Sequence, residues 1–310
     1  MLTEEITQWS RVERVVYRVE QRYQYTYSAP VRGLNHRFRV VPRSAHGDQR
    51  LLAHEVAVAG ASDEAAVGWD RDEFGNSVCT VQAEHVPEAV TFDASYHVQR
   101  FARSQEPPPF GDTGESVDLD RFLEPTPLTT PDEALTYAAE SIRANSPWQE
   151  GRAYRAFHWA AASIIYRTDV TGVDTTAAAA LAGGAGVCQD YSHILLTVLR
   201  LLGIPARYVS GHLLGEGAPH AWVEALFADN AAPGGVRVVA YDPTNRREPG
   251  LRYIAVALGR DYADVAPTSG WFVGRAQGHL TYTKRAEVIE VEYRDADIPT
   301  TERGRPGIRW

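Results

Sequence analysis

The chain has 310 residues, 44% of them hydrophobic, and its formal net charge is -9. A chain of this length and apolar content can bury a sizeable core, in one large domain or in two ordinary ones. Its basic residues are scattered, whereas a nucleic-acid or anionic-membrane surface needs clustered Lys and Arg. We therefore expect neither nucleic acid nor a membrane as a partner.

The N-terminus and the cysteines indicate the compartment. The first 18 residues, MLTEEITQWSRVERVVYR, are charged throughout, and no run of 18 apolar residues occurs elsewhere. This pattern predicts neither a signal peptide nor a membrane span, so we expect a cytoplasmic protein. The two cysteines, Cys79 and Cys188, lie far apart in the sequence. Such spacing fits neither a disulfide framework nor a cysteine-rich zinc site, and we expect two free thiols, with Cys79 in the core.

Alternation of apolar and polar residues predicts strands in the first third of the chain. Over residues 15–27 the odd positions are mostly Val and Tyr and the even positions mostly polar, which is the pattern of a half-buried strand. Further runs of β-branched and aromatic residues between turn signals lie at residues 36–41, 51–58, 77–83 and 90–101. We predict a β-sandwich domain over residues 1–105.

A change of composition marks the end of that domain. Residues 106–130 are rich in Pro, Gly, Ser and acidic side chains and are predicted to be a linker. Thr130 as N-cap and Pro131 as first helical residue then predict a helix that ends near residue 145. Helical spacing predicts further helices at about residues 151–166, 175–183 and 188–202.

The apolar period then changes from that of a helix to that of a strand. Three strand-like runs follow at residues 206–214, 220–227 and 236–242. Helices followed by antiparallel strands predict an α+β core, to which we assign residues 131–294, with a tail over 295–310. If the last two runs form a hairpin centred on its turn-rich loop, His220 lies directly opposite Asp242, close enough for a hydrogen bond.

Cys188 lies where an apolar helix follows a glycine-rich run, in the stretch GVCQDYSHILL. The N–H groups and positive dipole end of a helix N-terminus lower the pKa of a thiol there. The same N–H groups can stabilise the oxyanion formed when a thiolate attacks a carbonyl. A histidine held by a carboxylate would supply the base. Gly186 presents no side chain and would let a substrate approach closely.

The order Cys, His, Asp on a helix and two strands resembles the transglutaminase-like superfamily, a papain-related group. GVCQDYSHILLTVLRLLGIPARYVSGHL, PHAWVEALF, AYDPTN and VALGRDYADVAP are similar to its bacterial branch, and YQYTYSAPV, NHRFRVVP and DEFGN to the β-rich domain that precedes the core there. The resemblance implies an N-terminal β-sandwich and a papain-like α+β core, in which the catalytic cysteine begins a helix packed on an antiparallel sheet. It also implies Cys188 as nucleophile, His220 as general base and acid, and Asp242 as its orienter.

Four other side chains are candidates for the same site. The Gln189 amide points either to an oxyanion or to solvent. Tyr166 precedes the cysteine at a distance where related enzymes place an aromatic oxyanion donor. Trp222 either walls the pocket or belongs to the core. Arg260 either borders the active site or forms an Arg–Asp pair that fastens its loop.

The remaining motifs argue against cofactors. The ten histidines include no HExxH and no close Cys/His cluster, and GGAGVC lacks the residues of phosphate and dinucleotide loops. We expect no metal and no organic cofactor. The sequence favours a cysteine-dependent hydrolase, a peptidase or amidase, that acts on a peptide, protein or small amide through an acyl-thiolate. An acyltransferase or amide-forming enzyme with a primary amine acceptor, and a non-enzymatic binding module, are the alternatives. A protein partner bound through the N-terminal domain and the oligomeric state both stay open.

Overall fold

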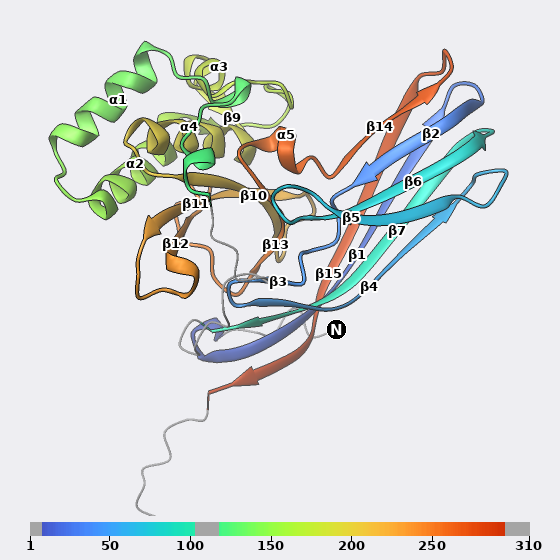
Figure 1. The fold of residues 1–310 in the computed structure, drawn as a ribbon, viewed down its shortest axis with the longest axis horizontal. Coiled ribbons are helices and arrows are strands. Elements are labelled where there is room, and N and C mark those ends of the chain that lie inside the picture. Colours follow the sequence, from blue (N-terminus) through green and yellow to red (C-terminus); the bar gives the residue numbers. More distant parts are fainter. Residues whose placement is uncertain (1–7, 103–117, 295–310) are drawn as a thin grey trace, which may run out of the picture.

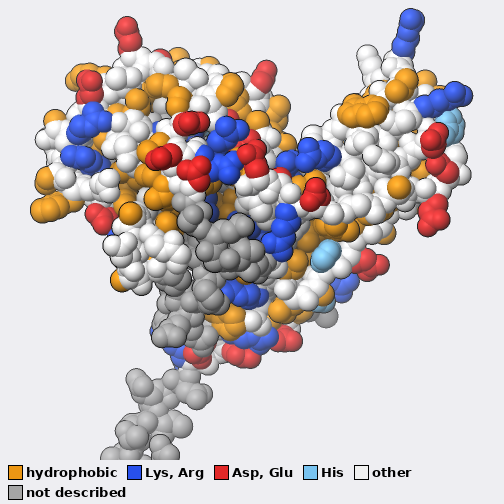
Figure 2. Space-filling view, viewed as in Figure 1, with side chains coloured by type: hydrophobic (Ala, Val, Ile, Leu, Met, Phe, Trp, Pro, Cys, Tyr) orange, Lys and Arg blue, Asp and Glu red, His pale blue; other side chains and the backbone are white. Residues whose placement is uncertain are grey.

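The computed structural model describes residues 8–102 and 118–294 (Figure 1). An elongated pair of sheets lies beside a body in which helices cover a smaller sheet. On the face shown in Figure 2, acidic and basic side chains lie next to each other near the junction of these two parts. Within the described ranges, no helix is both long enough and apolar enough to cross a membrane.

Two antiparallel sheets form the elongated part, with strand orders β15-β1-β7-β4-β3 and β14-β2-β6-β5. Their bounds are β1 Val12–Tyr27, β2 Val31–Phe38, β3 Ala45–His46, β4 Gln49–Ala59, β5 Ala66–Arg71, β6 Ser77–Val86, β7 Ala89–Phe101, β14 Thr268–Val273 and β15 Gly278–Tyr293. Tyr23 and Phe92 from the first sheet pack against Phe38 from the second, with ring centroids 4.3–6.2 Å apart. The predicted β-sandwich is therefore confirmed.

The sandwich is completed by the C-terminal strands of the described chain. β15 pairs with β1 from Tyr293 opposite Val12 to Gly278 opposite Tyr27, and β14 pairs with β2. The predicted core of residues 131–294 is therefore wrong at its C-terminal boundary, because residues 268–293 belong to the sandwich. Without β15, the long strand β1 would be an open edge with unpaired N–H and C=O groups.

The core has a four-stranded antiparallel sheet of order β12-β11-β10-β13; the sequence predicted an antiparallel sheet and three of these strands, but not β13. Its elements are α1 Glu133–Ala144, α2 Gln149–Ser163, α3 Ala177–Gly183, α4 Cys188–Leu201, β10 Ala206–Leu213, β11 His220–Ala228, β12 Val236–Tyr241, β13 Tyr253–Gly259 and α5 Tyr262–Val265. α4 packs on β11, and helices α1, α2 and α3 surround it. Because neighbours surround α4, it is apolar along most of its length, with Ile194, Leu195 and Leu199 fully buried.

Two helix boundaries differ from the prediction. The N-cap of α1 is Asp132, whose carboxylate accepts a 2.9 Å bond from Leu135 N, rather than Thr130. Both residue types cap helices well, so the sequence does not distinguish them. α2 ends at Ser163, and residues 165–166 form the short strand β8, which pairs in parallel with β9 at Ala185–Gly186. That non-local pairing ends the helix early.

The segments predicted as linker and tail lie partly outside the described residues. Residues 106–117 and 295–310 fall there. From residue 118 onward the chain packs on the core through two 3-10 helices, Asp120–Phe122 and Pro127–Thr129. Phe122 is buried against the core strands, so this part of the predicted linker is ordered structure.

The sandwich is fixed to the β13 edge of the core by buried side chains. The Asn76 amide bonds both N–H and C=O of Leu258 at 2.7–2.8 Å, and Gln49 does the same for Ala255 at 2.7–2.9 Å. Each amide thereby satisfies backbone groups that an edge strand leaves open. Tyr17 adds a 2.7 Å hydrogen bond to Leu251 O.

Candidate active site

Cys188 is the first residue of α4, and its side chain is partly exposed. The helix N-terminus is closed by Asp190, whose Oδ2 accepts from Val187 N at 2.7 Å while Asp190 N donates to Val187 O at 2.9 Å. In the described chain, the first-turn N–H groups that remain for a substrate oxygen are those of Cys188 and Gln189. These two donors could form an oxyanion hole beside the thiol.

Gly186 makes room for the carboxylate that caps α4. A β-carbon added at Gly186 would lie 2.6–2.8 Å from the Asp190 side chain. Thr171 Oγ1 donates to the same Asp190 Oδ2 at 2.7 Å, and burial raises the pKa of this carboxyl group. The glycine thus has a packing role that differs from the close substrate approach expected from the sequence.

His220 and Asp242 come together, although the predicted hairpin register is wrong. The observed pairs run from Val223 opposite Tyr241 to Ala228 opposite Val236, which places Asp242 diagonal to His220 instead of opposite it. A shift of two residues leaves both side chains on the same face of the sheet. His220 Nε2 and Asp242 Oδ2 are 2.7 Å apart.

Asp242 is completely buried and held by neutral donors. Its Oδ1 accepts from Thr244 N and Asn245 N at 3.0–3.1 Å. Its Oδ2 accepts from Tyr253 Oη at 2.7 Å and Asn245 Nδ2 at 2.8 Å. Burial acts to raise the pKa of Asp242, but His220 first, and then the side-chain hydrogen bonds from Tyr253 and Asn245, hold it below its usual value. Asp242 therefore stays ionised beside the imidazole.

His220 is linked to both the carboxylate and the thiol. Burial acts to lower its pKa, yet hydrogen bonds and charge interactions with Asp242 and Cys188 raise it to about 10. Because Nε2 faces Asp242, Nδ1 is the ring nitrogen that is left to exchange a proton with Cys188. A protonated imidazole stabilises a neighbouring thiolate, so this arrangement favours a reactive thiol.

Trp222 supports the histidine from within the protein. It is 2% exposed, and its ring is stacked on His220 with centroids 6.3 Å apart. It also meets Tyr253 edge to face at 5.4 Å. Trp222 and Tyr253 therefore fix the plane of the imidazole, and Tyr253 is a residue that sequence reasoning missed.

Tyr166 and Gln189, two further candidates for the site, lie in different environments. Tyr166 pairs with Gly186 and is 58% exposed; partial burial and the charges of Cys188 and Glu216 raise its pKa. Gln189 is 8% exposed, and its Nε2 donates to Gly172 O and Val173 O at 3.3 Å. Both expectations for the Gln189 amide, solvent and an oxyanion, are therefore wrong, because its two N–H donors hold the preceding loop.

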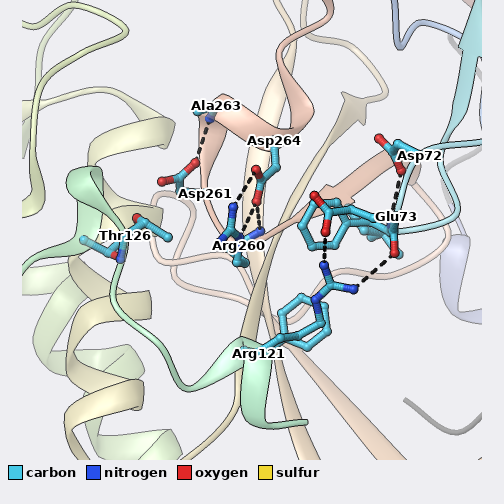
Figure 3. A network of polar contacts seen from close by, with 12 residues as sticks. Asp72, Glu73, Arg121, Thr126, Arg260, Asp261, Ala263 and Asp264 are labelled. Carbon is cyan, nitrogen blue, oxygen red and sulfur yellow. Dashed lines mark hydrogen bonds and ion pairs between the residues drawn. The ribbon is translucent and has the colours of Figure 1, made fainter. Parts of the chain in front are cut away.

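Arg260 forms the loop-fastening pair that was one of its two interpretations. Figure 3 shows its guanidinium against Asp264, with N···O distances of 2.9 and 3.2 Å. Arg260 Cζ also lies 5.8 Å from the centroid of the Phe74 ring, in the sandwich domain. In the same network Arg121 pairs with Glu73 at 2.5 Å. Arg260 thus ties the loop after β13 to the domain junction.

Glu216 is a second residue that the sequence analysis missed. Its Oε2 lies 3.6 Å from His220 Nδ1, and its side chain is 42% exposed. Its only sequence signal is a position four residues before His220, in a turn. The described ranges contain no group of three or more His, Cys, Asp or Glu side chains that could hold a metal ion.

Comparison with known proteins identifies the family. The model of the transglutaminase-like superfamily matches residues 136–243, and that of the bacterial transglutaminase-like N-terminal region matches residues 17–99. An uncharacterized protein of Mycobacterium leprae is 31% identical over 272 residues, which cover 83% of this chain and 92% of that one. The chain belongs to the transglutaminase-like superfamily. The resemblance found in the sequence motifs is confirmed.

A second relative and a solved structure are also similar to this chain. An uncharacterized protein of Mycobacterium bovis is 30% identical over 288 residues, covering 82% of this chain and 86% of that one. The solved structure of "a Putative Cysteine Protease from Cytophaga hutchinsonii" superimposes with a TM-score of 0.71 at 19% identity, covering 92% of this chain and 94% of the other. At that identity the likeness confirms the fold, including the sandwich-plus-core arrangement.

Proposed function

We propose that this transglutaminase-like protein is a cysteine-dependent hydrolase that cleaves an amide or peptide bond through an acyl-thiolate intermediate. The observation that carries the proposal is the 2.7 Å pair of His220 and Asp242 beside Cys188 at the N-terminus of α4, where both Asp242 and Cys188 raise the pKa of His220. Nucleophile, base and orienter in hydrogen-bond reach are the geometric requirement of nucleophilic catalysis.

The first half-reaction forms the acyl-enzyme. The Cys188 thiolate attacks the carbonyl carbon, and the N–H groups of Cys188 and Gln189 bind the oxyanion. As the C–N bond breaks, His220 transfers its Nδ1 proton to the leaving amine. Asp242 accepts the Nε2–H throughout and keeps the ring in this orientation.

The second half-reaction releases the acid. Neutral His220 takes a proton from a water molecule, which attacks the thioester carbonyl, and the C–S bond breaks to return the thiolate. Water is the proposed acceptor because the site is open: Tyr166 is 58% exposed and the Glu216 side chain 42%. An acyltransferase must keep water away from its thioester, which an enclosed site would do.

Selective alkylation tests the nucleophile without knowledge of the substrate. We expect iodoacetamide at pH 6 to modify Cys188 in the native protein far faster than it modifies a free thiol. In a His220→Ala variant this rate enhancement should be lost. Cys79 is an internal control, since it is fully buried and burial raises its pKa to about 11. Alkylation of Cys188 at the rate of the denatured chain would overturn the proposed function.

Proteomics then distinguishes hydrolysis from transfer. A cell lysate is incubated with a tagged primary amine and either the wild-type protein or Cys188→Ala, and peptides are identified by mass spectrometry. We expect Cys188-dependent new termini or deamidated side chains without the tag. Cys188-dependent incorporation of the tag would instead show that an amine is the acceptor and the protein an acyltransferase.

A further inference from the structure

Glu216 places a carboxylate at the edge of the candidate active site. It lies in the turn that joins β10 to β11, four residues before His220, and its Oε2 is 3.6 Å from His220 Nδ1. The side chain is 42% exposed, so a group arriving from solvent can reach it. Asp242, by contrast, is completely buried on the Nε2 side of the same ring.

The turn that carries Glu216 is anchored on both sides. Glu216 N donates to Leu213 O at 3.1 Å, and Leu214 N donates to Arg252 O at 2.9 Å. Lys284, from β15 of the sandwich, donates to Ala218 O at 3.0 Å. The carboxylate is therefore presented by a fixed backbone.

Glu216 keeps its charge available at the site. In the described chain the ion pair of Glu216 within 4 Å is with His220; Lys284 donates to the Ala218 carbonyl of the turn, and the Glu216 charge acts on Lys284 only from beyond ion-pair distance. The charge of Glu216, together with that of Cys188, also acts on Tyr166, whose pKa is raised chiefly by partial burial. The charge of Glu216 therefore acts on two side chains of the candidate site, His220 and Tyr166.

The chemistry identifies which part of the substrate meets Glu216. Since Asp242 holds Nε2, the proton given to the leaving amine comes from Nδ1, the nitrogen that Glu216 faces. The amine component of the bond consequently leaves on the side of Glu216. We propose that Glu216 forms an amine-side subsite that selects substrates whose amine component carries a further positive group, an ammonium or guanidinium.

This inference rests on the proposed function and gives it a substrate class. A carboxylate that is accessible and prepositioned attracts a cation and repels an anion without reorganisation. Amides of lysine-like, arginine-like or diamine-like components would be preferred over amides of acidic components. We therefore expect cationic groups to react faster at the site than anionic groups, and this difference should depend on the charge of Glu216.

Charged thiol reagents measure that preference directly at Cys188. The probes are aminoethyl methanethiosulfonate, which is cationic, and sulfonatoethyl methanethiosulfonate, which is anionic, with modification followed by mass spectrometry. The ratio of the two rates cancels any change in the fraction of thiolate. We expect Glu216→Gln to lower the cation-to-anion ratio by about tenfold, about threefold for each reagent, and Glu216→Lys to lower it further.

Glu140→Gln is the matched control, because it removes one exposed carboxylate from α1 and changes the net charge equally. It should leave the ratio unchanged. An unchanged ratio in Glu216→Gln, or an equal drop in Glu140→Gln, would overturn the subsite while leaving the nucleophile in place. A Cys188 that reacts with neither reagent in the wild-type protein would instead count against the proposed function and the subsite together.

Discussion

Strand β11 carries two histidine–carboxylate pairs with different partners. Near its start His220 meets Asp242 at 2.7 Å, and further along Glu224 meets His46 of the sandwich at 2.8 Å. Both carboxylates are buried, but Glu224 has a second cationic partner, Arg207, also at 2.7 Å. Among the residues that the structure describes, the carboxylate of Asp242 has neutral donors besides His220.

The difference determines what each pair can do. Arg207 balances the charge of Glu224 permanently, so together with His46 it overcomes the effect of burial and holds the pKa of Glu224 well below its usual range. Within residues 8–102 and 118–294 no arginine or lysine pairs with Asp242, and its charge acts on His220, whose pKa rises to about 10. The first arrangement suits a structural clamp between two domains, and the second suits proton transfer.

The largest effect is expected from breaking the clamp. Glu224→Gln removes the buried carboxylate that accepts a 2.7 Å hydrogen bond from Arg207, a side chain that is itself only 4% exposed. Removing one partner of a buried pair costs about 3–5 kcal/mol, so the free energy of unfolding measured with urea should fall by that amount. The alkylation rate of Cys188 in the folded variant should stay unchanged.

Glu140→Gln serves as the control for this stability measurement, since it makes the same change from carboxylate to amide at an exposed position. We expect a change within about 0.5 kcal/mol. A Glu224→Gln protein as stable as wild type would show that the clamp is not structural. A lower alkylation rate of Cys188 in this variant would show that the clamp belongs to the active site.

A smaller effect is expected from Asp242→Asn, on reactivity. The amide presents its N–H₂ group to His220 Nε2, which favours the wrong tautomer and removes the charge that raises the imidazole pKa. Each pKa unit that His220 loses lowers the population of the thiolate–imidazolium ion pair about tenfold. For a loss of about two units, alkylation of Cys188 at pH 6 should slow by roughly 100-fold.

Tyr253→Phe provides the matched comparison for that experiment. It removes one neutral donor, at 2.7 Å, from the same Asp242 Oδ2 and leaves the carboxylate charged. One such hydrogen bond contributes about 0.5–1.5 kcal/mol, so the rate should fall by no more than about tenfold. Equal losses in the two variants would mean that position, rather than charge, is what Asp242 supplies.

The sequence predicted the parts of this site that depend on local pattern. Cys188 follows a glycine-rich run and begins an apolar helix, and the two strands that carry His220 and Asp242 have a clear period of two. An error of two residues in the hairpin register still left His220 and Asp242 on one face, because side chains alternate with that period.

What the sequence did not predict depends on contacts between distant segments. Nothing in residues 278–293 indicates that they pair with β1 instead of joining the core, since a strand pattern does not name its partner. The Gln189 amide binds the backbone of a loop at Gly172, and the Glu216 carboxylate faces the His220 ring. Side-chain direction in such turns is fixed only by the packed structure.

The smallest effect separates the two pairs by pH. The folded-state pKa of His220 is raised to about 10 from a usual value near 6.5, so its contribution to stability is present below pH 6.5 and is lost as pH rises through 10. The folded-state pKa of Glu224 is lowered, so its contribution is present above the usual carboxyl range and is lost as pH falls. Asp242 also has a lowered pKa, so it adds to the loss of stability at acid pH.

The measurement is the free energy of urea unfolding as a function of pH, from pH 4 to pH 10. Its alkaline limb should be flatter in Asp242→Asn than in wild type. Glu224→Gln should keep the wild-type slope there and lose part of the acid limb. If Glu224→Gln flattened the alkaline limb as much as Asp242→Asn does, the distinction between a clamp and a proton-transfer pair would fail, because the two carboxylates would then affect stability over the same pH range.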